Sequence, residues 1–212
     1  MDARRRMNFR RCLNAISNQL SRQNLDDMKF VCKDHVPVSR MERVRSPLDL
    51  FQALEERGKM SADDTNFLAQ VLFSVDRSNL IPELQKAGFA PSVLPQPLQA
   101  PLTISHTDGP QPNPEFLFNE TLLKIAQHLS AKDVETLAYT WSEPLLQISV
   151  DRVTSGTHLF QLLQQRQLVT PTDLRMLFEE LQVIGRSELC KRINSYMEAT
   201  GQRPYHSDEA GV

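Results

Sequence analysis

An internal repeat constrains this chain more than any other feature of its sequence. Shifted by 109 positions, residues 9–87 align with residues 118–196 without a gap, and 19 of the 79 aligned pairs are identical. The strings LFQ and RS recur at aligned positions. Because the identical pairs are mostly apolar residues at helical spacing, the repeat predicts two copies of one architecture.

Each copy has the apolar spacing of short amphipathic helices. In the first copy, Leu13, Ile16 and Leu20 follow an i, i+3, i+7 pattern, and strict alternation of apolar and polar residues is scarce. This pattern favours helices over strands. We predict an all-α fold in which the first copy has helices near 8–20, 24–34, 47–57, 62–74 and 77–86 with a short helical turn around 39–45, and the second copy repeats them.

Residues that start and end helices support this prediction. Ser46 is followed by Pro47, and Ser61 has Asp64 three residues later; both are helix-start patterns. Gly58 suits a helix end. Each copy is therefore predicted to form a six-helix bundle.

Prolines separate the two copies. Residues 88–114 hold seven of the thirteen prolines. Proline lacks a backbone donor and fixes φ, so this stretch predicts a proline-rich linker between the bundles. The predicted boundaries are 1–87 for the first domain, 88–114 for the linker, 115–200 for the second domain and 201–212 for a disordered tail.

Charge is distributed unequally over the chain. The formal net charge is −2, but residues 1–87 carry 15 Lys and Arg against 12 Asp and Glu, and residues 88–212 carry 9 against 14. The halves, at +3 and −5, could attract each other or different partners. The small overall charge gives no reason to expect a membrane or nucleic acid as the partner.

Cysteine usage and hydropathy are typical of a cytoplasmic protein. Cys12, Cys32 and Cys190 lie in apolar or amphipathic stretches without paired spacing, so we expect reduced core thiols. No apolar core follows the arginines of residues 4–11 as it would in a secretory signal. No apolar run reaches the length of a transmembrane helix.

Patterns for catalysis and metal binding are missing from the sequence. The five histidines are scattered, and seven glycines leave little backbone to cradle a phosphate. The arginines of residues 4–11 form the only basic cluster, and binding nucleic acid by counterion release needs several phosphate contacts. We therefore expect no enzyme activity, no cofactor and no bound metal.

Several strings together carry a family resemblance. The first copy contains MKFVC and RVRSPLDLFQALEERGKMS, and the second contains HLFQLLQQRQLVT and LQVIGRSEL. An LF-x-x-L helix followed by an R-x-acid-L helix resembles the death effector domain, a six-helix member of the death-fold superfamily. The resemblance covers about 160 of the 212 residues. It implies a tandem death effector domain protein, similar to the prodomains of initiator caspases and to short FLICE-inhibitory proteins.

The resemblance implies a surface charge triad in which two acids flank an arginine. The planar fork of an arginine held by two carboxylates makes a patterned polar surface that a partner can recognise. The first acid, Asp133, lies three residues after Ser130, so we also expect it to cap a helix. Arg186 and Glu188 are two residues apart, and such residues do not face each other within a helix. The triad of the second copy is Asp133, Arg186 and Glu188, and the aligned residues of the first copy are Asn24, Arg77 and Asn79.

The resemblance also implies a solvent-facing hydrophobic patch on the second helix. In the first copy Phe30 and Val31 occupy its positions, and in the second copy Tyr139 and Thr140 make a more polar pair. We expect the first pair to be the exposed anchor. Trp141, aligned with a cysteine of the first copy, is expected in the core.

These features predict a non-enzymatic adaptor or regulator of apoptotic signalling. Its partners would be death effector domain proteins, either adaptors or procaspase prodomains, and it could self-associate. None of its cysteines has the QACxG-like setting of a caspase nucleophile. The unequal copies suggest inhibition or tuning rather than initiation. The alternative is an adaptor whose second half is a death domain, linking a death receptor to caspases.

Overall fold

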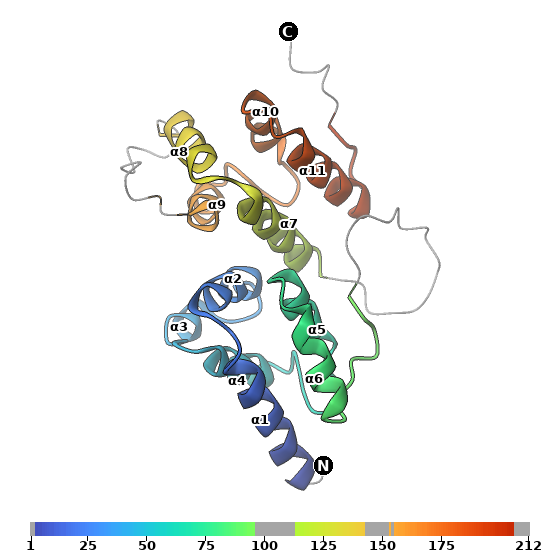
Figure 1. Cartoon of the computed structure of the whole chain (residues 1–212). Coiled ribbons are helices and arrows are strands. Elements are labelled where there is room, and N and C mark those ends of the chain that lie inside the picture. Colours follow the sequence, from blue (N-terminus) through green and yellow to red (C-terminus); the bar gives the residue numbers. More distant parts are fainter. Residues whose placement is uncertain (1–2, 96–112, 143–152, 154, 206–212) are drawn as a thin grey trace. The chain divides into compact units, whose positions relative to one another are not determined.

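Every regular element is a helix in the part of the chain that the computed structural model describes (Figure 1). The predicted all-α fold is therefore confirmed. The chain divides into two compact units, Met1–Gln96 and Pro97–Val212, and each is described by itself. The described residues are 3–95, 113–142, 153 and 155–205.

In the first unit, the N-terminal helix α1 contacts α4 and α6, and α2 packs on α5. A 3₁₀ turn, η1, leads directly into α6. The elements are α1 (Ala3–Ser17), α2 (Arg22–Cys32), α3 (Val38–Met41), α4 (Pro47–Glu56), α5 (Asn66–Ser74), η1 (Ser78–Leu80) and α6 (Ile81–Lys86).

In the second unit, α7 contacts both α9 and α11, and α11 also packs on α10. A Cβ atom at Gly156 would lie 3.0 Å from the Cα and Cβ atoms of Ala126, so glycine permits the close approach of α9 to α7. The repeated short turn, predicted near 148–154, lies outside the described residues except for Val153. The elements are α7 (Pro114–His128), α8 (Ala131–Thr140), α9 (Gly156–Gln165), α10 (Arg175–Val183) and α11 (Ser187–Ala199).

The 109-residue offset holds in the structure. Helices α2, α4 and α5 begin 109 residues before α8, α9 and α10. Serine hydroxyls accept hydrogen bonds at matching helix starts: Ser21 and Ser130 cap the second helices, and Ser46 and Ser155 cap the fourth and its counterpart. Equal starts follow from equal capping chemistry, because each cap satisfies a backbone N–H that the helix leaves unpaired.

Two predicted helix starts are wrong. Helix α1 begins at Ala3 rather than near residue 8, because its first turns consist of alanine and arginines, which are strong helix formers. Helix α5 begins at Asn66 rather than near residue 62. The Ser61 N–H donates to the Asp64 carbonyl at 2.8 Å, and the Asp64 side chain accepts from the Asn66 N–H at 3.0 Å. The serine and aspartate thus form a turn before the helix.

The LF-x-x-L strings supply the core of each unit. Their leucines and phenylalanines have no exposed surface. Trp141 is also buried, as predicted, and so is its counterpart Cys32. The three cysteines are free and buried, and burial raises the pKa of Cys190 to about 11. The core residues of the strings are Leu50, Phe51 and Leu54 in α4, and Leu159, Phe160 and Leu163 in α9.

The residues after α4 and α9 allow a test of backbone strain. Gly58 has φ 66° and its counterpart Gln167 has φ 57°, and only glycine adopts this left-handed conformation without steric cost. Gly58→Ala should therefore lower the free energy of unfolding of the first unit by about 1 kcal/mol, and Gln167→Gly should raise that of the second by a similar amount or less.

Urea unfolding followed by the fluorescence of Trp141, the single tryptophan, would measure the effect in the second unit. Amide hydrogen exchange in α4 would measure the effect in the first unit. Changes of the same sign in the two variants would contradict the strain argument.

Candidate functional site

An arginine follows a sharp turn after α5 in the first unit and after α10 in the second. The turn residues are Asp76 with φ 56° and Gly185 with φ 76°. The backbone N–H groups of Arg77 and Arg186 then donate to carbonyls of the preceding helix, at 2.8 and 2.7 Å. Both arginines therefore stand immediately before the last helical segment, from which they reach the end of the first helix.

The guanidinium of Arg186 joins three segments of the second unit. Its Nε and Nη2 atoms donate to Oδ2 of Asp133 at 3.0 and 2.6 Å, and Nη1 donates to Oε1 of Glu188 at 3.2 Å. Nη2 also donates to the backbone carbonyl of His128 at 2.9 Å. The predicted triad is thus assembled. The prediction that Arg186 and Glu188 do not face each other is wrong. It assumed that both residues lie within a helix, but Arg186 is the residue before α11.

Asp133 has two roles in this arrangement. Its Oδ2 accepts from the N–H and the hydroxyl of Ser130, both at 2.8 Å, and completes a capping box at the start of α8. Burial alone would raise the pKa of Asp133, but the hydrogen bonds from Ser130 and Arg186 and the charge of Arg186 outweigh it. The pKa therefore lies below its usual value. The side chain of Asp133 is 18% exposed and that of Glu188 is 56% exposed. Asp133 is therefore the inner, mostly covered acid of the triad, and Glu188 is the outer acid that solvent can reach.

The matching site of the first unit, here called its arginine corner, consists of Arg77, Gln19, Asn24 and Asn79. None of these residues carries a carboxylate. Arg77 Nη2 donates to the backbone carbonyl of Gln19, the counterpart of His128. Asn24 Oδ1 accepts from the N–H and hydroxyl of Ser21 at 3.1 and 3.0 Å, and Asn79 is exposed. The Nε atom of Arg77 is buried and has no hydrogen-bond acceptor among the described residues. The sequence did not reveal either backbone carbonyl as an arginine acceptor, although their equivalence follows from the 109-residue offset.

The predicted exposure of Phe30 and Val31 is wrong. Their side chains are 1% and 0% exposed. Helix α2 is buried on more than one side, so positions outside its main apolar stripe are covered as well. Tyr139 and Thr140, at the aligned positions, are both exposed, Tyr139 by 75%.

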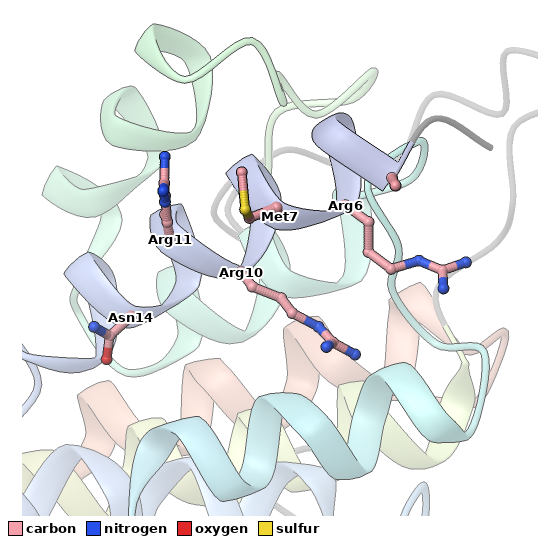
Figure 2. A pocket seen from close by; sticks show the side chains of 6 residues that line it. Arg6, Met7, Arg10, Arg11 and Asn14 are labelled. Atoms are coloured by element: carbon pink, nitrogen blue, oxygen red, sulfur yellow. The ribbon is translucent and has the colours of Figure 1, made fainter.

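The arginine cluster lies on α1. Arg5 is engaged there: it donates to the Ala62 carbonyl at 3.2 Å and pairs with Asp63 at 3.1 Å. An open hollow lies along this helix, and the half-exposed Met7 is among the side chains that line it (Figure 2). The lining residues are Ala3, Arg6, Met7, Arg10, Arg11 and Asn14.

Metal sites and membrane-spanning helices are both absent from the described residues. No group of three or more His, Cys, Asp or Glu residues there could hold a metal ion. No helix in that part of the chain is long and apolar enough to cross a membrane.

Comparison with known proteins identifies the repeated unit. The death effector domain family matches residues 9–88 and 118–199. This chain belongs to the death effector domain family. Each unit therefore contains one death effector domain, and the triad lies in the second.

The similar proteins include caspases and FAS-associated death domain proteins. Caspase-8 of Rattus norvegicus is 24% identical over 93% of this chain and 38% of its own length. The FAS-associated death domain protein of Homo sapiens is 34% identical over 39% of this chain and 41% of its own length. Caspase-10 of Homo sapiens is 30% identical over 37% of this chain and 15% of its own length. The chain thus spans less than half the length of each.

Removing the inner carboxylate should weaken the second death effector domain. Asp133→Asn keeps a capping side chain but leaves Arg186 without its closest acceptor, so the free energy of unfolding should fall by about 1–2 kcal/mol at neutral pH. Because the pKa is depressed in the folded state, this contribution is present above the unfolded pKa of about 4 and is lost as pH falls through the folded pKa.

Trp141 fluorescence during urea unfolding would test this pH dependence. The difference between wild type and Asp133→Asn should shrink between neutral pH and about pH 3. Glu188→Gln is the control, since a half-exposed acid contributes little to stability. An unchanged difference at the two pH values would contradict the assignment.

Supplying the missing carboxylate should strengthen the first death effector domain. Asn24→Asp keeps the capping oxygen and offers Arg77 an ionised acceptor, while also placing an acid in the first turn of α2. We expect the free energy of unfolding to rise by about 0.5–1 kcal/mol. Hydrogen exchange in α2 would measure the gain, and the part due to Arg77 should disappear when Arg77→Ala is added. If Asn24→Asp raises the free energy of unfolding by the same amount without Arg77, the gain comes only from the acid in the first turn of α2, and the proposed pair with Arg77 is contradicted.

Proposed function

We propose that this chain is a non-enzymatic, cytoplasmic adaptor or regulator of apoptotic signalling that binds other death effector domain proteins. The observation that carries the proposal is the assembled Asp133–Arg186–Glu188 triad on a death effector domain. The names of the similar proteins, caspase-8 and FAS-associated death domain protein, point to apoptotic signalling. Adaptors and procaspases are therefore the partners we propose.

The outer acid of the triad, Glu188, suits recognition better than fold stability. Asp133 holds the guanidinium from inside, and Glu188 remains exposed beside it. Exposed ion pairs contribute only about 0–1 kcal/mol to stability. Charged groups held in a fixed pattern instead set the orientation and specificity of an approaching partner.

Unequal domains support a tuning role. A non-closing assembly grows only when each unit offers two competent faces. The first domain has no carboxylates in its arginine corner, and its predicted hydrophobic anchor is buried. We propose that the chain joins assemblies of death effector domains and limits their growth.

An adaptor with one death effector domain and one death domain is the competing function. The second half of such a protein would match a different family. Here residues 118–199 match the death effector domain, which favours two domains of one kind.

Binding of the full chain to the human FAS-associated death domain protein and to caspase-8 tests the proposal. Glu188→Gln should weaken binding by about tenfold without unfolding the second domain. Glu198→Gln removes the same charge from an exposed position on α11 and should bind as wild type does. Equal binding by both variants would show that the triad is not the contact. Failure of the wild-type chain to bind either protein would overturn the proposed function.

A further inference from the structure

The guanidinium of Arg77 is only partly satisfied within its own domain. Its one acceptor among the described residues is the Gln19 carbonyl, and its Nε atom is buried without an acceptor. In the second domain, Nε and Nη1 of the aligned Arg186 donate hydrogen bonds to the carboxylates of Asp133 and Glu188. The corner of the first domain therefore has the donors of an ion-pair network without its anions.

An incompletely paired arginine costs folding free energy, since a buried donor without an acceptor loses its hydrogen bonds to water. The neutral Asn24 oxygen accepts from both Ser21 donors but makes no hydrogen bond to the buried Nε of Arg77. Asn79, at the position of Glu188, is neutral and exposed. The place at Nη1 that Glu188 fills in the second domain can therefore be reached from outside.

A carboxylate with suitable surroundings lies on the second domain. Glu179 is exposed on α10, three residues after Met176 and four before Val183, which are 41% and 80% exposed. These three side chains share one face of the helix. Exposed apolar residues around a charge are typical of a protein contact.

The charge around Glu179 favours an incoming cation. Burial of the adjacent Glu180 and the negative charge of Glu179 both raise the pKa of Glu180. A guanidinium beside them would offset that repulsion. The net charges of the two halves of the chain, +3 for residues 1–87 and −5 for residues 88–212, act in the same direction.

We propose that Arg77 of one copy of this chain binds the Glu179 carboxylate of a second copy, which takes the place that Glu188 takes on Arg186. The contact joins different surfaces of two copies, so it is heterologous. It uses the arginine alone and is distinct from the complete charge triad, which the first domain does not offer to other death effector domain proteins. This inference rests on the proposed homotypic association and names one contact within it.

Sedimentation velocity of the full chain at low and physiological salt tests the contact. Wild type should self-associate, more weakly as salt screens the pair. Arg77→Glu and Glu179→Arg should each weaken association by about tenfold or more, and the double variant, which reverses the pair, should recover most of the loss. Arg57→Ala and Glu198→Arg change charge at other exposed positions and should associate as wild type does.

Asn79→Glu separates binding from folding. The new carboxylate would occupy Arg77 within its own domain, so self-association should fall by about tenfold while unfolding in urea is unchanged or shifts to higher concentration. Gln52→Glu adds the same charge at an exposed position on α4 and is the matched control.

Three outcomes would overturn the inference: a wild-type chain that stays monomeric, an Asn79→Glu variant that associates as wild type does, or a double reversal without recovery. None of these outcomes concerns binding to the FAS-associated death domain protein. The proposed function is therefore tested separately, by that binding.

Discussion

Serine caps at the starts of short helices set the register on which both domains depend. Isolated helices of this length are marginal in water, so their starts are fixed by capping and by burial of an apolar face. Ser21 and Ser130 place the second helix, and Ser46 and Ser155 place the helix that contains LF-x-x-L. With these starts fixed, the leucines and phenylalanines of that helix are buried in the core. The later turn presents an arginine to a backbone carbonyl just before the second helix begins.

The same cap decides how the two domains differ. At the third position of the second helix, either an aspartate or an asparagine accepts from the serine N–H, at 2.8 and 3.1 Å. Only the aspartate also carries a charge for the arginine across the corner. A single amide for carboxylate change therefore preserves the helix start while it removes the ion pair. This is why two domains of one fold can offer different surfaces.

The family resemblance predicted much of the candidate site. It placed Asp133 and Arg186 together, and the 109-residue offset located their counterparts Asn24 and Arg77. It was wrong about Phe30 and Val31, because a sequence pattern identifies the main apolar face of a helix and not the additional sides that packing covers. It also missed the carbonyls of Gln19 and His128, since every residue has a carbonyl and only the fold selects which one meets a guanidinium.

The sequence by itself determined the helical fold and its duplication, because apolar spacing and capping residues are local properties that recur 109 residues apart. The tertiary structure alone decided which donors are satisfied. Arg77 and Arg186 follow similar turns and share the motif Arg-Ser-x-Leu, yet one guanidinium is enclosed by carboxylates and the other has a buried donor without an acceptor. The physical reason is that hydrogen bonding depends on atoms brought together from three separate segments of the chain.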